Sequence, residues 1–331
     1  MLLTLLSAVL FILAFPITRY DCSLWPLAFI CLGPLVVSLE RTGSLPRQFL
    51  SGVLWGSVVA LGRGYWLFYA MIGEYHVRIV PALLVMLFGV MAPFALIYGF
   101  LGLVFGAARN RDILSHLILF PSIWVLAEYS REIIPFLVPW GLLGYAVQPW
   151  NCYIQMADST GVYGISFVLA LCNGGVAYLC RGVNAATFRQ MMKRGVAARV
   201  VRCLSDNRAV CVLLALAMLL PLSYGAARRF AVREMVERNV TAGKVIPVTI
   251  AQPNFTQEER WKSTGFIDRV NVCLGLTGRC ALPPVRGEEE KGHAIPGSRG
   301  LVVWPETVLN SAGNVNSMLL DHFRARLPGF G

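Results

Sequence analysis

The stretch Gly300-Leu301-Val302-Val303-Trp304-Pro305-Glu306-Thr307-Val308-Leu309-Asn310 predicts a strand that carries one carboxylate at its end. Its apolar, strand-forming half is expected to be a buried strand, which Pro305 ends because proline donates no hydrogen bond to a ladder. Glu306 then lies at the carboxyl edge, where open α/β sheets collect catalytic groups. Beside Trp304 and Pro305 a carboxylate is partly desolvated, which raises its pKa toward the range of a general base. A carboxylate in a solvated turn is the competing interpretation.

The composition is that of an integral membrane protein. Of 331 residues, 56% are hydrophobic and 14% are charged, whereas a typical globular protein has about 25% charged residues. The net charge of +11 does not indicate nucleic-acid binding, because the basic residues lie between apolar segments rather than among aromatic residues on a polar face. Nine cysteines form no CxxC pair and no His/Cys cluster, so we expect no metal site and no cofactor.

Seven apolar segments follow one another in the first two thirds of the chain, most of them long enough to span a bilayer. They are Leu2–Phe15, Leu24–Leu39, Phe49–Ile72, Ile79–Ala108, Ile113–Ala127, Thr160–Cys180 and Ala209–Ala226. The first has no basic region before it and is followed closely by the second, which favours a retained membrane hairpin over a signal peptide.

The basic residues between these segments are distributed unequally. With the N-terminus in the cytoplasm, loops 40–48, 109–112 and 181–208 are cytoplasmic and hold eleven Lys and Arg residues, whereas loops 16–23, 73–78 and 128–159 hold three. Because an excess of Lys and Arg belongs on the cytoplasmic side, this orientation is favoured. Seven spans then place everything beyond Ala226 outside the cytoplasm.

Several residues within the membrane part are candidates for more than anchoring. Arg63 lies inside the third segment, and an ionisable residue at that depth marks a functional site or an arginine that snorkels or pairs with a neighbouring helix. Trp140 and Tyr145 lie near the predicted outer membrane face, where aromatic residues commonly anchor helices. Small residues four apart, at Gly52/Gly56 and Gly102/Gly106, predict close helix packing.

From Lys244 the sequence predicts a layered α/β domain. A strand over Val245–Ile250 is followed by Thr256 as a helix N-cap with Glu259 three residues later, and by a helix toward Leu276. A loop over 281–299 and the strand Leu301–Trp304 complete a β-α-β unit. Cys273 either pairs with Cys280 or is a buried helix residue. We therefore expect a membrane domain over residues 1–227 and an extracytoplasmic domain over 228–331.

In its order of motifs the chain resembles apolipoprotein N-acyltransferase, a bacterial inner-membrane enzyme family with a nitrilase-like domain. The resemblance rests on Trp25-Pro26-Leu27 through Gly33-Pro34-Leu35, Gly52 with Trp55-Gly56 and Tyr65-Trp66, Pro139-Trp140 with Gly144-Tyr145, Gly161 to Phe167, Gln252-Pro253-Asn254 with Trp261, and Trp304-Pro305-Glu306. It implies a polytopic α-helical membrane domain of about seven spans, followed by part of an α/β nitrilase-like (α-β-β-α sandwich) domain on the periplasmic side of the inner membrane.

The resemblance also implies an activity. A phospholipid is the acyl donor, and the acceptor is the amine of a lipoprotein's N-terminal diacylglyceryl-cysteine. The chain is transferred through a thioester on a cysteine, with glutamate as general base and lysine stabilising the oxyanion. Glu306 matches that glutamate. Trp140 and Trp261 match positions associated with the substrate cavity, and Tyr145 and Arg63 are further substrate-binding candidates.

The chain departs from the family after Glu306. The lysine, the cysteine and the final span that follow in the family are absent, since Thr307–Gly331 contains no Lys and no Cys. We therefore expect an interrupted acyltransferase that needs a second polypeptide to complete its nitrilase-like domain. The alternative is an inactive membrane paralogue that binds lipid or lipoprotein. A small-solute transporter ranks last, because no internal repeat accompanies Arg63 and the prolines of the fourth segment.

Overall fold

The computed structural model divides the chain into two compact units, Met1–Phe230 and Ala231–Gly331, each of which is described by itself. It describes residues 1–16, 24–108, 112–134, 139–181, 205–244, 248–256, 259, 266–279 and 301–304. Trp261, Glu306, Cys280 and the predicted loop 281–299 lie outside these ranges.

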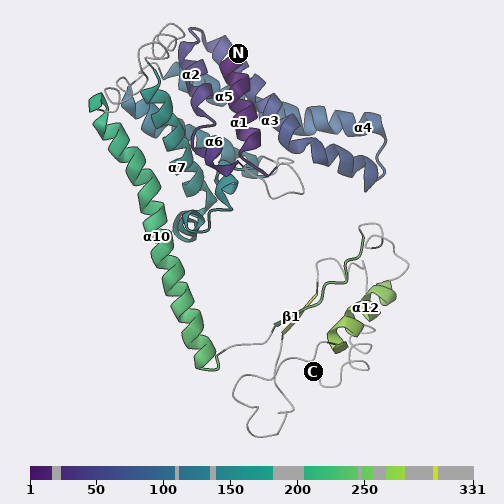
Figure 1. The fold of residues 1–331 in the computed structure, drawn as a ribbon. Helices are drawn as coiled ribbons and strands as arrows, with labels where there is room; N and C mark the ends of the chain where they lie inside the picture. Colours follow the sequence, from purple (N-terminus) through teal and green to yellow (C-terminus); the bar gives the residue numbers. More distant parts are fainter. Residues whose placement is uncertain are drawn as a thin grey trace. The chain divides into compact units, whose positions relative to one another are not determined.

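The first unit is a bundle of helices (Figure 1). Its elements are α1 (Leu2–Leu13), η1 (Trp25–Phe29), α2 (Gly33–Arg41), α3 (Leu45–Gly73), α4 (Ile79–Leu84), η2 (Val85–Met91), α5 (Ala92–Ala107), η3 (Ser115–Leu119), α6 (Phe120–Ile133), η4 (Leu143–Val147), η5 (Tyr153–Met156), α7 (Ala157–Leu179) and the greater part of α10 (Arg208–Thr241), whose residues from Ala231 belong to the second unit. The segments η2 and η3 are π-helical, and each leads into a helix with proline in its first turn, where the missing N–H is tolerated.

The core of this bundle is aromatic. Trp55 of α3 is fully buried, and its ring centroid lies 4.7 Å from that of Tyr98 and 5.4 Å from that of Trp124. Its indole Nε1–H donates a hydrogen bond to Oγ of Ser7 at 3.0 Å. Because a buried indole N–H needs an acceptor, this bond ties α1 to the centre of the bundle.

Glycines let α3 and α5 approach closely, as their spacing predicts. A Cβ on Gly52 would lie 2.0 Å from the carbonyl oxygen of Tyr98, and one on Gly102 would lie 2.5 Å from that of Gln48. Backbone contact at this distance admits only glycine.

The second predicted segment is broken, which corrects the expectation of one span over Leu24–Leu39. It forms the short η1 and the separate α2, because Pro26 and Gly33-Pro34 interrupt the ladder of hydrogen bonds. Backbone groups around this interruption form hydrogen bonds with the side chain of Asn173 on α7. Its Oδ1 accepts from the N–H of Leu32 at 2.6 Å and of Gly33 at 3.2 Å, and its Nδ2–H donates to the carbonyl of Ala28 at 2.7 Å.

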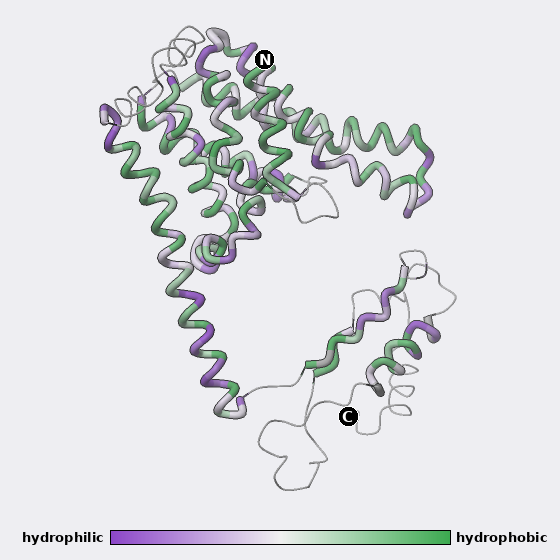
Figure 2. The backbone as a smooth tube through the Cα atoms, viewed as in Figure 1, coloured by the Kyte–Doolittle hydropathy of each residue, from purple (hydrophilic) through white to green (hydrophobic). Residues whose placement is uncertain are grey.

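Three helical segments of the described ranges are long and apolar enough to cross a membrane: Ile79–Ala107, Tyr153–Leu179 and Arg208–Thr241. Leu2–Leu13 is apolar but shorter. Figure 2 shows that hydrophobic residues predominate along α4 and the first half of α10. The mostly helical fold, with three helices long and apolar enough to span, thus agrees with the sequence, and the count of seven spans stays a prediction.

Helix α10 continues fifteen residues beyond the predicted end at Ala226, to Thr241. Its second half is hydrophilic (Figure 2) and contains two ion pairs at i,i+4 spacing, Arg233–Glu237 and Arg238–Glu234. Such pairs and good helix formers stabilise a helix in water, so the end of the apolar run does not end the helix.

The second unit contains a parallel pair of strands with a helix between them in sequence. Strand β1 (Val248–Ile250) pairs with β2 (Leu301–Val303) in the register Val248↔Leu301, and α12 spans Phe266–Arg279. Among the described residues the strands are not buried as predicted, since Leu301 and Ile250 are 54% and 73% exposed. The sheet described here has only two strands, too few to bury both faces.

Two local predictions in this unit are confirmed. The backbone N–H of Thr256 donates to the Glu259 carboxylate at 2.8 Å, and the N–H of Glu259 donates to Oγ1 of Thr256 at 3.3 Å, which is a capping box. Cys273 is a fully buried free thiol on α12, and burial raises its pKa. Cys273 is therefore a buried helix residue, which is one of the two interpretations that the sequence allowed.

Candidate functional site

Arg63 and Trp140 line one pocket. Arg63 lies on α3, and Trp140 lies in the turn that precedes η4. The pocket has a volume of about 200 Å³ and is walled mainly by apolar side chains of α3, η2 and α5, with Trp66 and Phe94 among them. The rings of Trp66 and Trp140 pack with their centroids 4.9 Å apart. The sequence thus named two members of a real cavity from segments far apart in the chain.

Arg63 is the charged member of this pocket. Its guanidinium lies 4.1 Å above the ring of Phe15, and Nη1–H donates a long hydrogen bond of 3.5 Å to the carbonyl of Pro16. Its Nε is buried without a hydrogen-bond partner among the described residues. A cation with spare donors beside apolar walls suits a ligand that is anionic at one end and greasy at the other.

Side chains of α6 and α7 hold the turn that carries Trp140 through hydrogen bonds. Oε1 of the fully buried Glu128 accepts the N–H of Leu143 at 2.6 Å, and Nη1–H of Arg131 donates to the carbonyl of Trp140 at 3.2 Å. Oγ of Ser166 accepts the N–H of Gly144 at 2.9 Å. Sequence reasoning placed Glu128 and Arg131 at a membrane face but missed this role. The available signal was a Glu and an Arg one helical turn apart in an apolar segment.

Of the other predicted site residues, the structure describes only Tyr145. It lies on η4, is 48% exposed and is not among the residues that line the cavity. Trp261 and Glu306 lie outside the described residues, so their roles stay predictions. Within the described ranges no group of three or more His, Cys, Asp or Glu residues is arranged to hold a metal ion.

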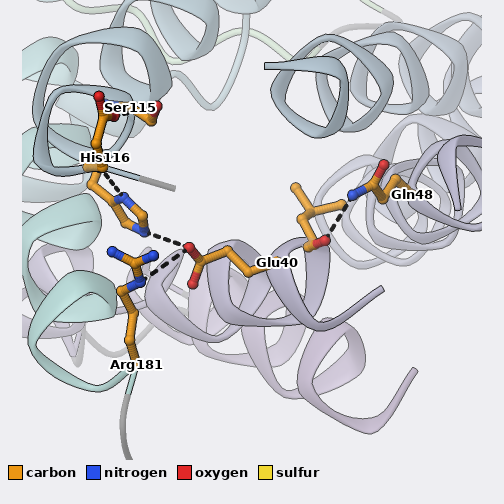
Figure 3. Close-up of polar contacts among 7 residues, drawn as sticks. Glu40, Gln48, Ser115, His116 and Arg181 are labelled. Atoms are coloured by element: carbon orange, nitrogen blue, oxygen red, sulfur yellow. Dashed lines mark hydrogen bonds and ion pairs between the residues drawn. The ribbon is translucent and has the colours of Figure 1, made fainter. Parts of the chain in front are cut away.

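A second polar cluster, which sequence reasoning did not find, lies at the other end of α3. Gln48 and Arg63 are fifteen residues apart on this helix, or about 22 Å. Figure 3 shows the Glu40 carboxylate between His116 and Arg181. Its Oε1 lies 3.0 Å from Nε2 of His116 and 3.5 Å from Nε of Arg181, beside a cavity of about 520 Å³.

The two cavities differ in what they offer a ligand. In the Glu40 cluster the carboxylate already lies beside the Arg181 guanidinium and the His116 ring. Gln48 donates to the carbonyls of Leu39 and Thr42 at 2.9 and 3.0 Å. The Arg63 pocket instead holds an uncompensated donor in apolar surroundings. The Arg63 pocket is therefore the candidate functional site.

Comparison with known proteins agrees with the motifs that surround this pocket. The family model described as "Apolipoprotein N-acyltransferase N-terminal domain" matches residues 7–175. The chain belongs to the apolipoprotein N-acyltransferase family. The matched range contains every described residue that lines the Arg63 pocket.

Individual members of the apolipoprotein N-acyltransferase family match most of the chain. Two proteins of that name, from Geobacter metallireducens and Chlorobaculum tepidum, are 29% identical over 310 residues and 28% identical over 313 residues. These alignments cover 92% and 93% of this chain but 50% and 49% of the relatives. A third, from Chromobacterium violaceum, is 26% identical over 240 residues, 70% of this chain and 39% of its own length. The chain spans about half the length of the curated relatives it matches.

Proposed function

We propose that this protein takes part in N-acylation of lipoproteins and that its helical unit binds the phospholipid acyl donor in the Arg63 pocket. The observation that carries the proposal is the pairing of one cation with an aromatic wall. Arg63 presents a buried, unpartnered Nε, while Trp66, Phe94 and Trp140 form apolar surface beside it. A phospholipid has the matching parts, a phosphate for the guanidinium and an acyl chain for the aromatic wall.

The chemistry that we propose follows the family expectation. Glu306 accepts the proton of a cysteine thiol, and the thiolate attacks the ester carbonyl of the donor, releasing a lysophospholipid and leaving a thioester. The free amine of the diacylglyceryl-cysteine then attacks the thioester, and the thiol is regenerated. Cys273 is not this nucleophile, because it is fully buried and precedes Glu306. The cysteine and an oxyanion-stabilising lysine come from a further polypeptide segment that completes a nitrilase-like domain.

The same proposal places the protein in the bacterial inner membrane, with Met1 in the cytoplasm and residues beyond α10 in the periplasm. The supporting observation is the charge difference between the loops, together with three helices long and apolar enough to span. A reporter enzyme fused after Gly243 is expected to register as periplasmic. A cytoplasmic signal would overturn the orientation and, with it, the access of Glu306 to lipoproteins.

The second candidate is a membrane paralogue that binds lipid or lipoprotein without transferring an acyl chain. The observation that favours it is that the described lining of the Arg63 pocket contains no carboxylate, thiol or lysine. Both candidates use the Arg63 pocket and differ only in the chemistry that follows binding.

The test uses a strain depleted of its own acyltransferase, in which N-acylation of a reporter lipoprotein is followed by mass spectrometry. The 331-residue chain is expressed alone or with the C-terminal half of the Geobacter relative. Acylation in either arm that is lost in Glu306→Gln but not in Glu258→Gln supports the enzyme. If acylation is absent from both arms while brominated phospholipid still quenches the fluorescence of Trp140, the result supports the paralogue. Unchanged quenching in Arg63→Gln would refute the donor site.

A further inference from the structure

A second apolar cleft lies between η1, α7 and α10, away from the Arg63 pocket, with which it shares no lining residue. Its volume is about 350 Å³. The aromatic part of its wall comes from Trp25, Phe29 and Trp150, and the remaining wall includes Val176 of α7 with Leu214 and Met218 of α10. Trp25 and Trp150 pack with their centroids 4.9 Å apart.

The cleft exists because α10 touches the bundle at two separated places. A Cβ on Gly175 of α7 would lie 2.6 Å from Cδ2 of Leu214, and one on Gly225 would lie 1.7 Å from the carbonyl oxygen of Cys152. Between these contacts the helix is linked to the bundle by Tyr153, whose hydroxyl donates to the carbonyl of Ala217 at 3.2 Å. The open space beside Met218 therefore has fixed walls at both ends.

One face of α10 carries both the lining residues of this cleft and a cationic side chain, that of Arg229. Leu214, Met218, Gly225 and Arg229 succeed one another at intervals that keep them on the same helical face. Nη1–H of Arg229 donates to Sγ of Cys152 at 3.3 Å, and sulfur is a weak acceptor. No carboxylate among the described residues pairs with Arg229, whereas the neighbouring Arg228 is paired with Asp158 at 2.7 Å.

The spacing along α10 matches one leaflet of a bilayer. Met218 lies eleven residues from Arg229, or about 16 Å along the helix, and half of a hydrocarbon core is about 15 Å. With Arg229 at the depth of the headgroups, Leu214 and Met218 of the cleft lie near the middle of the membrane. At that depth, lipid chains are the molecules available to fill an apolar gap, and an unfilled gap loses packing contacts on both walls.

We propose that this cleft is a second, structural lipid site that holds a single bilayer phospholipid. One acyl chain lies between Met218 and the Trp25–Trp150 pair, and the phosphate accepts hydrogen bonds from the exposed guanidinium of Arg229. The lipid fills the gap between α7 and α10 and so secures the helix that leads into the second unit. This site goes beyond the proposed acyl transfer and does not depend on it.

The experiment uses the full chain in phosphatidylcholine vesicles that contain a trace of phosphatidylcholine with a diazirine in mid-chain. After irradiation, adducts are mapped by peptide mass spectrometry. We expect them to concentrate on residues 172–176 and 214–218 of the cleft. Leu219 and Leu220, which are exposed and do not line the cleft, report on ordinary surrounding lipid in the same sample.

Variants separate the two halves of the site. Met218→Trp and, independently from α7, Val176→Phe fill the cleft and are expected to lower its adducts about tenfold while leaving those of Leu219 and Leu220 unchanged. Arg229→Gln is expected to lower capture of the phospholipid about tenfold, the factor expected for one charge-assisted hydrogen bond. A diazirine fatty alcohol, which has no phosphate, is expected to be captured equally by Arg229→Gln and wild type.

The matched control is Arg233→Gln, which removes an arginine on the same helix that is already paired with Glu237. An equal loss of phospholipid capture in Arg229→Gln and Arg233→Gln would overturn the proposed contact between Arg229 and the phosphate. Adducts spread evenly over all faces of α10, or cleft adducts unchanged in both filling variants, would mean surrounding lipid only and would overturn the site. Either result leaves the Arg63 pocket untouched, because the two cavities share no residue.

Discussion

Nε2 of His116 lies 3.0 Å from Oε1 of Glu40, while Nδ1 of the same ring lies 2.9 Å from the carbonyl oxygen of Asp112. A carbonyl only accepts, so this second contact is a hydrogen bond in the tautomer that carries the proton on Nδ1. Both side chains are buried.

Removing one partner of this contact is expected to destabilise the fold by up to about 3 kcal/mol. Glu40→Ala should cost more than His116→Ala, because His116→Ala leaves Glu40 with Arg181 at 3.5 Å. Glu40→Ala and His116→Ala test this singly, and the double variant completes a cycle. We expect the double variant to lose at least about 1 kcal/mol less than the sum of the two single losses. Denaturant titration in detergent measures all three, and strictly additive losses would contradict the pairing.

Asp112 at the start of the same helix gives a prediction about pH. The Ser115 hydroxyl at 2.7 Å and the Ser115 N–H at 2.9 Å both donate to its carboxylate and lower its pKa. A lowered pKa stabilises the fold above the unfolded value of about 3.9 and loses that effect as pH falls through the folded value. Asp112→Asn should therefore lower the thermal midpoint at pH 7, and the difference should shrink as pH falls below about 4 and vanish below the lowered pKa of Asp112. Asp206→Asn serves as the control, and a difference that persists in acid would contradict the prediction.

Asn173 is expected to be the least replaceable polar residue of the bundle interior. Its amide also donates to the carbonyl of Leu169 at 2.8 Å, so all of its hydrogen bonds are to backbone. Asn173→Leu leaves the N–H of Leu32 without its acceptor, at about 1–3 kcal/mol. It also removes one of two hydrogen bonds from the N–H of Gly33, which keeps the carbonyl of Ile30, and from the carbonyl of Ala28, which keeps the Cys31 thiol. The thermal midpoint in detergent should fall sharply, whereas Asn151→Leu, at an exposed turn, should leave it unchanged. A tolerated leucine at 173 would show that water replaces the amide.

Two glycines of α3 are expected to respond oppositely to alanine. At Gly52 the new Cβ meets backbone of α5 at 2.0 Å, whereas at Gly64 its nearest neighbour is a flexible side chain at 3.7 Å. Gly52→Ala must separate the helices and should cost several kcal/mol, as overpacking does at about 1–3 kcal/mol or more. Gly64→Ala should gain up to about 1 kcal/mol from helix propensity. Unfolding titrations of the pair decide this, and equal effects would exclude the close contact.

Patterns that are local in sequence predicted local structure well. The capping box at Thr256 depends on two residues three apart, and the glycine spacing in α3 and α5 depends on one helical period. The boundary at Ala226 failed because the apolar run ends where Arg228 and Arg229 begin, whereas the helix continues on ion pairs at i,i+4. Hydrophobicity indicates which part of a helix suits the membrane, whereas helix propensity and ion pairs determine how far the helix continues.

Contacts between distant segments were accessible only in part. Arg63 was singled out because a charge is unusual in its apolar segment, whereas Trp140 was named through the family resemblance. The Asn173 amide reaches Leu32 across 141 residues, and no periodicity encodes that contact. Tyr145 belongs to the same family motif as Trp140, but it does not line the cavity.

The last prediction concerns the turn that positions Trp140. Glu128 holds the N–H of Leu143 and Ser166 holds that of Gly144, so each amide has one identifiable buried acceptor. Loss of an acceptor costs about 1–3 kcal/mol, which corresponds to amide exchange about 5- to 150-fold faster if the turn opens locally. Glu128→Ala should accelerate exchange at Leu143 and weaken brominated-phospholipid quenching of Trp140, while Glu128→Gln, which retains an oxygen acceptor, should do so less. Ser166→Ala should act at Gly144. Ser159→Ala, on the same helix but bonded to Met156, should change neither amide, and faster exchange there would mean that α7 as a whole has loosened.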